Sequence, residues 1–544
     1  MRSFAPLVCC VLVLAAIGPH IAAGQVEPEF LAGTTASGPT EPSIHAVYPD
    51  PVAGGDEGEF VVLDAPAGSD IGQYEITDGD STASLPNTTA RGRVAVSTAP
   101  NRTQELTERS VVGLDGHLAL ANGGERIRLQ RGNETVDAVQ YTDAVEGELG
   151  LVNGSVVRWR PLGASDRPVV RAAGGEVRAF ALPDAPAAPL RSIRNATERV
   201  FLAGYTLSSD RVADALIAAQ RRGVTVRVLL EGEPVGSRTA AEANTLDRLA
   251  EAGISVRVLT GPRVRYRYHH AKYAVADGRA VVLTENWKPA GTGGNSSRGW
   301  GVVTSQPRVI DGLNQTFHAD AGWQDTERWQ DYRQGRQFEQ GEPATGSYPK
   351  KFEAESVSVQ RTDLLVTPDN AQGELVGTID DADDAIDVIQ PTVGNWDSPL
   401  LRALRRAASR GVEVRLLLSD AWYVREENEQ TAQRFREWAD RSDAPLTAKV
   451  SDPDGRYEKI HAKGAVIDDE RVVVGSLNWN EQAATENREV VLVLHGSDAA
   501  DYFGAVFEAD WDAGGFDTPV GILVALSGLL VVAGLAARRV VFER

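Results

Sequence analysis

Cysteine is almost absent from this chain of 544 residues, and what there is lies at one end. The two cysteines, Cys9 and Cys10, fall in the apolar run that opens the sequence. If residues 1–24 are removed on export, the mature chain has no cysteine. Disulfide frameworks, cysteine-ligated zinc sites and thiol nucleophiles are then excluded together.

Lysine is also scarce, since only seven of the 55 basic residues are lysine and the rest are arginine. With 76 acidic residues, the formal net charge is −21. An acidic, arginine-rich composition is typical of a protein adapted to high salt, because dense carboxylates keep the surface hydrated. The net charge therefore does not exclude a phosphate-bearing substrate, and the charge around a site has to decide.

Long charge-free hydrophobic runs occur only at the two ends. Residues 1–24 have one arginine, an apolar core and then small residues, which predicts a signal peptide. Residues 519–537 carry no charge over 19 positions, which at about 1.5 Å per residue spans a bilayer core of about 30 Å. An uncleaved anchor and a buried core helix are the respective alternatives.

Charges around the second run set the expected topology. Aspartates precede it and arginines follow it, so the positive-inside rule predicts a single-pass membrane protein with a cytoplasmic tail at 538–544 and an extracellular body. Seven Asn-x-Ser/Thr sites fit an exported, glycosylated surface. They begin at Asn87, Asn101, Asn133, Asn153, Asn195, Asn295 and Asn314.

The front of the body is rich in β-strand patterns. A polar spacer at 25–40 leads into residues 41–163, where short apolar runs alternate with turns and no helical period is present, which predicts an all-β sandwich. The runs GDEGEFVVLDAP and LALANGGERIRLQRGNETVDAVQY resemble the lamin-tail domain, which is immunoglobulin-like. The resemblance implies a binding or tethering role, with a surface partner.

The back of the body is a duplication. From about residue 170, apolar strand patterns alternate with amphipathic helix patterns, which predicts an α/β sheet. The same series recurs, giving one copy at 170–323, a linker at 324–355 and a second copy at 356–513. Even the openings (ALPDAPAAPL and VTPDNAQGEL) and the ends (TFHAD and VFEAD) match, so a whole domain has been repeated.

Each copy carries one His-x-Lys-x4-Asp motif followed by a polar segment. The motif residues are His270, Lys272 and Asp277 in the first copy, and His461, Lys463 and Asp468 in the second. Thr284 and Asn286 follow the first motif, and Ser476 and Asn478 follow the second. Two such matches at equivalent points of a repeat do not arise by chance.

These motifs resemble those of the phospholipase D superfamily, over roughly residues 170–513. The resemblance implies an α/β fold of two duplicated α-β-α sandwich halves around a pseudo-twofold axis. It also implies hydrolysis or transfer of phosphodiesters. The same pair of motifs serves phospholipids and nucleic acids in this family, so the substrate stays open.

The spacing has a chemical reason. In a strand, residues two apart point to one face, so each copy presents an imidazole and an ammonium together. Two copies facing each other would surround one phosphate. One neutral histidine can attack phosphorus and form a phosphohistidine, while the other protonates the leaving oxygen. The lysines, with Thr284, Asn286, Ser476 and Asn478, can hold the phosphate oxygens, so we expect no metal and no cofactor.

The two copies differ in the carboxylate that orients the histidine in this family. The second copy has Glu489, whereas the first has Gly301 at what looks like the same place. We therefore expect Glu489 to bind His461, which would make His461 the nucleophile and leave proton delivery to His270. The missing carboxylate also leaves open a degenerate domain kept for binding.

Three functions remain open. Closeness to the predicted span favours a phospholipid substrate and contact with the membrane through the C-terminal helix. The alternating run at 263–268 (RVRYRY) and the lamin-tail resemblance favour an extracellular nuclease. A non-catalytic surface-binding protein is the third reading. Trp287 and Trp479, next to the motif asparagines, could stack on a substrate or pack in the core.

Overall fold

We describe a computed structural model of the protein over residues 41–51, 55–107, 109–162, 167–261, 264–341 and 343–513. The predicted signal peptide, the spacer, the C-terminal span at 519–537 and the tail lie outside these residues. Within them, no helix is both long enough and apolar enough to cross a membrane.

The front domain is a pair of β-sheets with one short helix, α1 (Pro100–Leu106). One sheet has the order β11-β10-β1-β2-β5-β6 and the other β7-β4-β3-β8-β9. Its strands are β1 (Ser43–Tyr48), β2 (Phe60–Asp70), β3 (Glu75–Thr77), β4 (Thr82–Ser84), β5 (Thr89–Ser97), β6 (Val111–Gly113), β7 (Asp115–Gly116), β8 (Arg126–Arg131), β9 (Glu134–Gln140), β10 (Glu148–Asn153) and β11 (Val156–Pro161). This agrees with the predicted all-β domain, while the likeness to lamin-tail domains stays a prediction.

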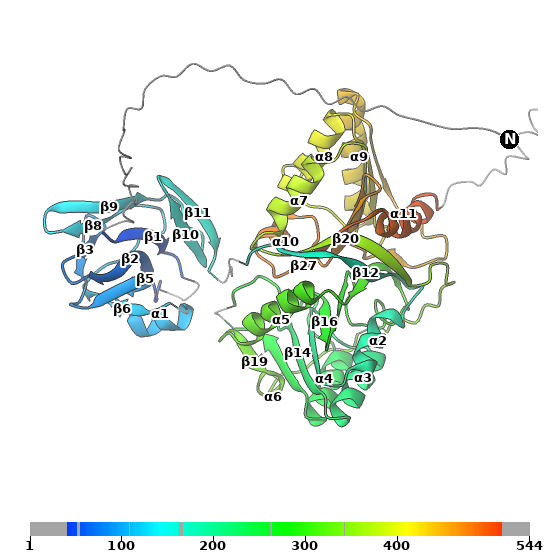
Figure 1. Ribbon diagram of the computed structural model, residues 1–544, viewed down its shortest axis with the longest axis horizontal. Coiled ribbons are helices and arrows are strands. Elements are labelled where there is room, and N and C mark those ends of the chain that lie inside the picture. The colour runs from blue at the N-terminus through cyan, green and yellow to red at the C-terminus, as the bar shows by residue number, and fades with distance from the viewer. Residues whose placement is uncertain are drawn as a thin grey trace, which may run out of the picture. The chain divides into compact units, whose positions relative to one another are not determined.

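The back of the chain forms one continuous sheet shared by two halves (Figure 1). The first half contributes β12 (Val170–Leu182), β13 (Arg199–Gly204), β14 (Thr225–Glu231), β15 (Ser255–Leu259), β16 (Tyr273–Ala276), β17 (Arg279–Leu283), β18 (Ser297–Thr304) and β19 (Thr326–Arg328). The second contributes β20 (Glu355–Val366), β21 (Ala385–Gln390), β22 (Glu413–Leu418), β23 (Leu446–Val450), β24 (Lys459–Ile460), β25 (Gly464–Ile467), β26 (Arg471–Gly475) and β27 (Val490–His495).

The strand order shows the duplication directly. It runs β19-β15-β14-β13-β16-β17-β18-β12-β20-β27-β26-β25-β21-β22-β23, with β24 beside β18. Read from either end, the order of equivalent strands is the same, apart from β19 at one edge. The long antiparallel pair β12–β20 lies at the centre, with Val177 opposite Val357. This is the predicted pair of α/β halves around a pseudo-twofold axis.

Helices cover both faces of the sheet. In the first half they are α2 (Ala188–Asn195), α3 (Asp210–Arg221), α4 (Ala240–Glu251), α5 (Pro307–Ala321) and α6 (Trp329–Tyr332). In the second they are α7 (Ala371–Asp380), α8 (Pro399–Ser409), α9 (Arg425–Ser442), α10 (Glu481–Thr485) and α11 (Ser497–Trp511). Helices α5 and α11 share one core that crosses both halves, whereas α2–α4 and α7–α9 close separate cores.

Local sequence explains these elements. The strand β13 (RVFLAG) is buried along almost its whole length, as a central strand of a covered sheet should be. The helix α8 (PLLRALRRAAS) begins with proline and buries its leucines and alanines, while Arg402 and Arg406 are exposed. The predicted linker is partly structured, because β19 pairs with β15 and extends the first half.

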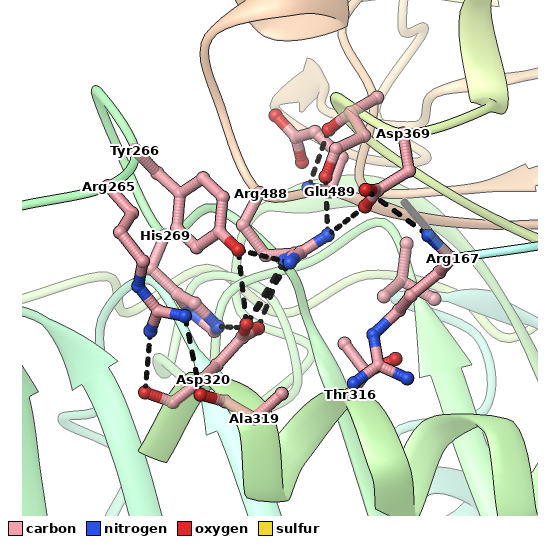
Figure 2. A network of polar contacts seen from close by, with 12 residues as sticks. Arg167, Arg265, Tyr266, His269, Thr316, Ala319, Asp320, Asp369, Arg488 and Glu489 are labelled. Atoms are coloured by element: carbon pink, nitrogen blue, oxygen red, sulfur yellow. Dashed lines mark hydrogen bonds and ion pairs between the residues drawn. The ribbon is translucent and has the colours of Figure 1, made fainter. Parts of the chain in front are cut away.

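Two buried arginines join the halves. Arg488, just before β27, forms ion pairs with Asp369 (2.7 Å) and with Asp320 of helix α5 in the other half (3.1 Å), as Figure 2 shows. Its guanidinium also lies 4.4 Å from the ring centre of Tyr266. Burial alone would raise the pKa of Asp320, but Arg488, His269 and Arg265 together outweigh burial and hold that pKa below its ordinary value.

Arg298 repeats the arrangement in the opposite direction. It forms ion pairs with Asp184 of its own half (2.5 Å) and with Asp510 of helix α11 in the other half (2.8 Å). Its guanidinium lies 4.7 Å from the ring centre of Tyr457. Each half therefore inserts one arginine between an aspartate of its own and an aspartate on a helix of the other half, α5 or α11.

We predict that Arg488→Met lowers the free energy of unfolding by about 3–5 kcal/mol, because it leaves Asp320 and Asp369 buried without their cation. Denaturant unfolding curves measure this. The control is Arg425→Met, whose exposed ion pair with Glu429 should be worth about 0.5 kcal/mol or less. Similar losses for both variants would contradict a locking role for Arg488.

Candidate active site

The two motif histidines lie just before the equivalent strands β16 and β25. The backbone of Arg488 or Arg298 holds each of them. The main-chain N–H of His270 donates to the carbonyl of Arg488, and that of His461 donates to the carbonyl of Arg298, both at 2.9 Å. Each histidine is thus fixed by the backbone of the opposite half. The predicted meeting of the two motifs follows from this crossing.

The orienting carboxylate also crosses between halves. Nδ1 of His270 lies 2.9 Å and 3.0 Å from the two carboxylate oxygens of Glu489. The expectation that Glu489 would bind His461 of its own half is therefore wrong. The reason is that the segment before β27 lies against residues 268–270 of the first half, where Arg488 also donates its N–H to the Tyr268 carbonyl.

His461 has a carboxylate partner that the sequence did not suggest. Its Nδ1 lies 3.3 Å from Oε2 of Glu285, which is 3% exposed and follows strand β17 of the first half. The position equivalent to Glu489 in the first half is Gly299 rather than Gly301, since Thr284 bonds to Trp300 just as Ser476 bonds to Val490.

Glu285 fills the space that a side chain at Gly299 would take. A Cβ on Gly299 would lie 2.3 Å from Cγ of Glu285. The first half therefore supplies its carboxylate from the segment after β17, whereas the second half supplies its carboxylate from the segment before β27. Gly301 has a separate role, because a Cβ there would lie 2.2 Å from the buried ring of Phe180.

The motif lysines lie beside their histidines. Nζ of Lys272 donates to the His270 carbonyl at 2.6 Å, and its ammonium is 5.4 Å from the ring centre of Tyr205. Nζ of Lys463 donates to the His461 carbonyl at 2.8 Å and lies 3.2 Å from Nδ1 of His461. That nitrogen can therefore donate to Glu285 or accept from Lys463.

Burial sets the charges of these groups. It lowers the pKa of His270 to about 4, although Glu489 opposes the shift. Burial and then the Lys463 ammonium lower the pKa of His461 to about 4. Burial likewise lowers the pKa of Lys463 to about 8. Near neutral pH the site thus combines neutral imidazoles with an ammonium that is easily deprotonated.

The two motif aspartates are not brought to this site. Asp277 sits in the turn after β16, where its carboxylate accepts the N–H groups of residues 197–199. Asp468 occupies the equivalent turn after β25 and accepts those of residues 383–385. Both turns have left-handed backbone, with φ of 50° and 53°. The structure corrects their predicted catalytic role to a structural one.

The predicted phosphate ligands divide into two kinds. The hydroxyls of Thr284 and Ser476 accept main-chain N–H groups at 3.0 Å, from Trp300 and Val490 respectively, and so support the strand ends. Asn286 and Asn478 follow them and are half-buried. Oδ1 of Asn286 is shielded from solvent and has no hydrogen-bond partner among the described residues, so this acceptor is open to a donor group.

Other residues singled out in the sequence belong to the core. Trp287 and Trp479 are buried, and Nε1 of Trp287 donates to a carbonyl of β13, so packing explains both rings. Arg265 of the RVRYRY run is held by Asp325 at 2.9 Å, with little exposure, so its charge is already paired. The described residues contain no group of three or more His, Cys, Asp or Glu side chains able to hold a metal.

The residues missed by sequence reasoning are Glu285, Tyr205, Arg298 and Arg488. Tyr205 follows β13 and meets the His270 ring edge-on, with ring centres 4.8 Å apart. Only Glu285 left a signal, because it stands where the second copy has Leu477. An acid in place of an apolar residue beside a catalytic motif is a cue for function.

Comparison with known proteins supports the two duplicated halves. The family model described as "Cardiolipin synthase, PLD-like domain" matches residues 190–321 and 375–511. The two halves belong to the phospholipase D superfamily. The chain is 26% identical over 125 residues to the mitochondrial cardiolipin hydrolase of Chlamydomonas reinhardtii, a match that covers 23% of this chain and 51% of that protein.

Matches to other relatives also cover only part of each chain. The mitochondrial cardiolipin hydrolase of Mus musculus is 31% identical over 118 residues, which covers 22% of this chain and 48% of that protein. The chain thus spans about half the length of these relatives. Among solved structures, the phosphatidylserine synthase of Haemophilus influenzae matches with a TM-score of 0.47 and 12% identity, over 66% of this chain and 94% of that one.

We predict that Glu285→Gln and Glu489→Gln each lower kcat for a phosphodiester by about a hundredfold or more, because each leaves one histidine without its orienting carboxylate. Steady-state kinetics on a nitrophenyl phosphodiester measure this. Glu470→Gln, an exposed change after β25, is the control. Near-normal activity of the Glu285 variant would show that His461 does not depend on this contact.

Proposed function

We propose that this protein is a phospholipid phosphodiesterase or phosphatidyltransferase that works through a phosphohistidine. The supporting observation is the pair of His–carboxylate contacts, each made between the two halves and each beside a buried lysine. The matched family description and the names of the relatives support a phospholipid as the substrate.

We assign the nucleophile to His270. Glu489 accepts the Nδ1–H of His270, which fixes the tautomer and leaves Nε2 with its lone pair. Nε2 attacks phosphorus, the P–N bond forms, and the bond to the leaving alcohol oxygen breaks. The sequence favoured His461 as the nucleophile because Glu489 was expected to contact it. Glu489 instead contacts the ring of His270.

His461 then acts as acid and base. It has the single, longer contact to Glu285 and shares its Nδ1 with Lys463. A bound phosphodiester anion favours a proton on this ring, which passes to the leaving oxygen. His461 next takes a proton from water or an alcohol as that oxygen attacks phosphorus, and the P–N bond breaks. Hydrolysis and transfer differ only in the second acceptor.

Two alternatives lose part of their support. The nuclease hypothesis drew on the RVRYRY run, in which Arg265 is buried against Asp325, and on the lamin-tail resemblance, which stays a prediction. The non-catalytic reading drew on a missing carboxylate, and Glu285 supplies one. We also propose that the body is extracellular and tethered by residues 519–537, a proposal that rests on the sequence alone.

The covalent intermediate should form on His270. With His461→Ala and a nitrophenyl phosphodiester, whose leaving group needs no proton, the intermediate should accumulate because water lacks its base. Rapid quenching without acid and peptide mass spectrometry locate the phosphate. His270→Ala should give no adduct, and His318→Gln, outside the site, should behave as the parent protein. Phosphate on His461 would reverse the assignment.

The pH profile of kcat/KM for the same substrate should be set by His270 and by the two motif lysines, since burial lowers the pKa of both Lys272 and Lys463. Because His270 must be neutral and its pKa is lowered to about 4, activity should fall only as the pH drops toward 4. Because Lys463 must be charged and its pKa is lowered to about 8, activity should fall again above pH 8. Lys463→Arg should change the position of the alkaline fall, since arginine stays protonated and only Lys272, whose pKa burial also lowers, still loses a proton. An unchanged alkaline limb in that variant would exclude Lys463 as its source.

Activity should survive EDTA, because histidine and lysine side chains supply the proton transfer and charge stabilisation. The test compares release of headgroup from cardiolipin vesicles with cleavage of single-stranded DNA, both at high salt with and without chelator. We expect cleavage of the lipid in both conditions. Cleavage of DNA alone, or loss on chelation that one divalent ion restores, would contradict the proposal.

A further inference from the structure

The catalytic body exposes large apolar side chains on two equivalent loops. Trp422 is 88% exposed and Tyr423 is 52% exposed, both between β22 and α9. Val235 is 73% exposed, between β14 and α4 of the first half. Because β14 and β22 are equivalent strands, the two halves carry these groups at matching places.

Each loop begins at a residue that is hydrogen-bonded to the residue just before a catalytic histidine. Oγ of Ser419, which begins the second loop, accepts the N–H of Ile460 at 3.2 Å. Oε2 of Glu231, at the equivalent place, accepts the N–H of His269 at 2.7 Å. Ile460 and His269 directly precede the two motif histidines. The exposed loops therefore sit at the carboxyl ends of the parallel strands, on the same side as the reacting groups.

A cation connects the second loop with the site. Lys459 and His461 are two residues apart in an extended segment, and Ile460 between them is buried, so Lys459 and His461 share the face toward the site. The Lys459 ammonium lies 5.3 Å from the ring centre of Tyr423, whose ring meets that of Trp422 edge-on at 5.5 Å. These contacts form a series in space that leads from the reacting groups to solvent, through His461, Lys459, Tyr423 and Trp422.

We propose that Trp422, Tyr423 and Val235 enter the headgroup layer of a phospholipid bilayer, with Lys459 facing the lipid phosphates. This inference rests on the proposed phospholipid substrate. Tryptophan and tyrosine prefer the interface, because their rings are apolar at one end and polar at the other. A lysine beside them adds attraction to phosphate. Contact on both loops would set the two histidines against the headgroup that they cleave.

A single-stranded nucleic acid fits these residues less well. Trp422 and Tyr423 could stack on bases, but Val235 offers no ring for stacking. A strand also needs several cations along its backbone. Of the two described arginines of the RVRYRY run, Arg265 is paired with Asp325 and only Arg267 is exposed. A bilayer uses all three exposed side chains.

The test separates binding to a surface from chemistry. The full-length double variant Trp422→Ser/Tyr423→Ser is compared with the parent on one phospholipid in two forms. One form is a vesicle of equal parts phosphatidylcholine and phosphatidylglycerol that contains the substrate, and the other is a short-chain substrate below its micelle concentration. We expect kcat/KM to fall about tenfold or more on vesicles and to stay within about twofold on the monomer.

The control variant is Val156→Ser, which removes an exposed apolar side chain of the front domain and should change neither value. A second readout needs no turnover. The emission of Trp422 is obtained as the difference in fluorescence between the parent and Trp422→Phe. In vesicles that contain brominated lipids, this emission should be strongly quenched.

Each other result overturns the inference. Equal loss on both substrate forms would assign the loop to catalysis or folding, and no loss on vesicles would remove its role. Weaker binding of a single-stranded oligonucleotide with unchanged vesicle hydrolysis would assign the loop to nucleic acid. If the parent protein cleaves neither lipid form, the proposed function itself fails, whereas the quenching result still reports on the surface contact.

Discussion

The reciprocal insertion of Arg298 and Arg488 is the contact on which the rest of the catalytic body depends. Each guanidinium is buried between an aspartate of its own half and one on helix α5 or α11 of the other half. The carbonyls of the same two arginines hold the N–H groups of His461 and His270. Glu489 follows Arg488 directly, so its position is fixed by the same contact. The ion pairs that join the halves therefore also set the geometry of the reacting groups.

The pattern of residues predicted the architecture well. Alternating strand and helix periods, repeated with the same openings and ends, were enough to predict two α/β halves around a twofold axis. The His-x-Lys spacing was enough to predict that two imidazoles and two ammonium groups meet. These features depend on periodicity and on one-face geometry, which are local properties of the chain.

The pairing of carboxylates could not be predicted in the same way. Glu489 and His461 belong to the same half, but the histidine that Glu489 contacts is set by which backbone segment crosses the twofold axis. The equivalence of Gly299 and Glu489 depends on register between β17 and β18, and counting along the chain instead selected Gly301. The motif aspartates misled for a related reason, since a fixed spacing does not distinguish a catalytic carboxylate from one that closes a turn.

The crossed contacts also order events during biosynthesis. His270 is made early, but its carboxylate comes from residue 489 and the aspartate that pairs with Arg298 comes from α11. Domains generally fold in the order in which they leave the ribosome, so the first half must wait for nearly the whole body before its histidine is held. A nascent or truncated chain consequently contains the first motif without a working centre. Activity is thereby restricted to chains that have been completed through α11.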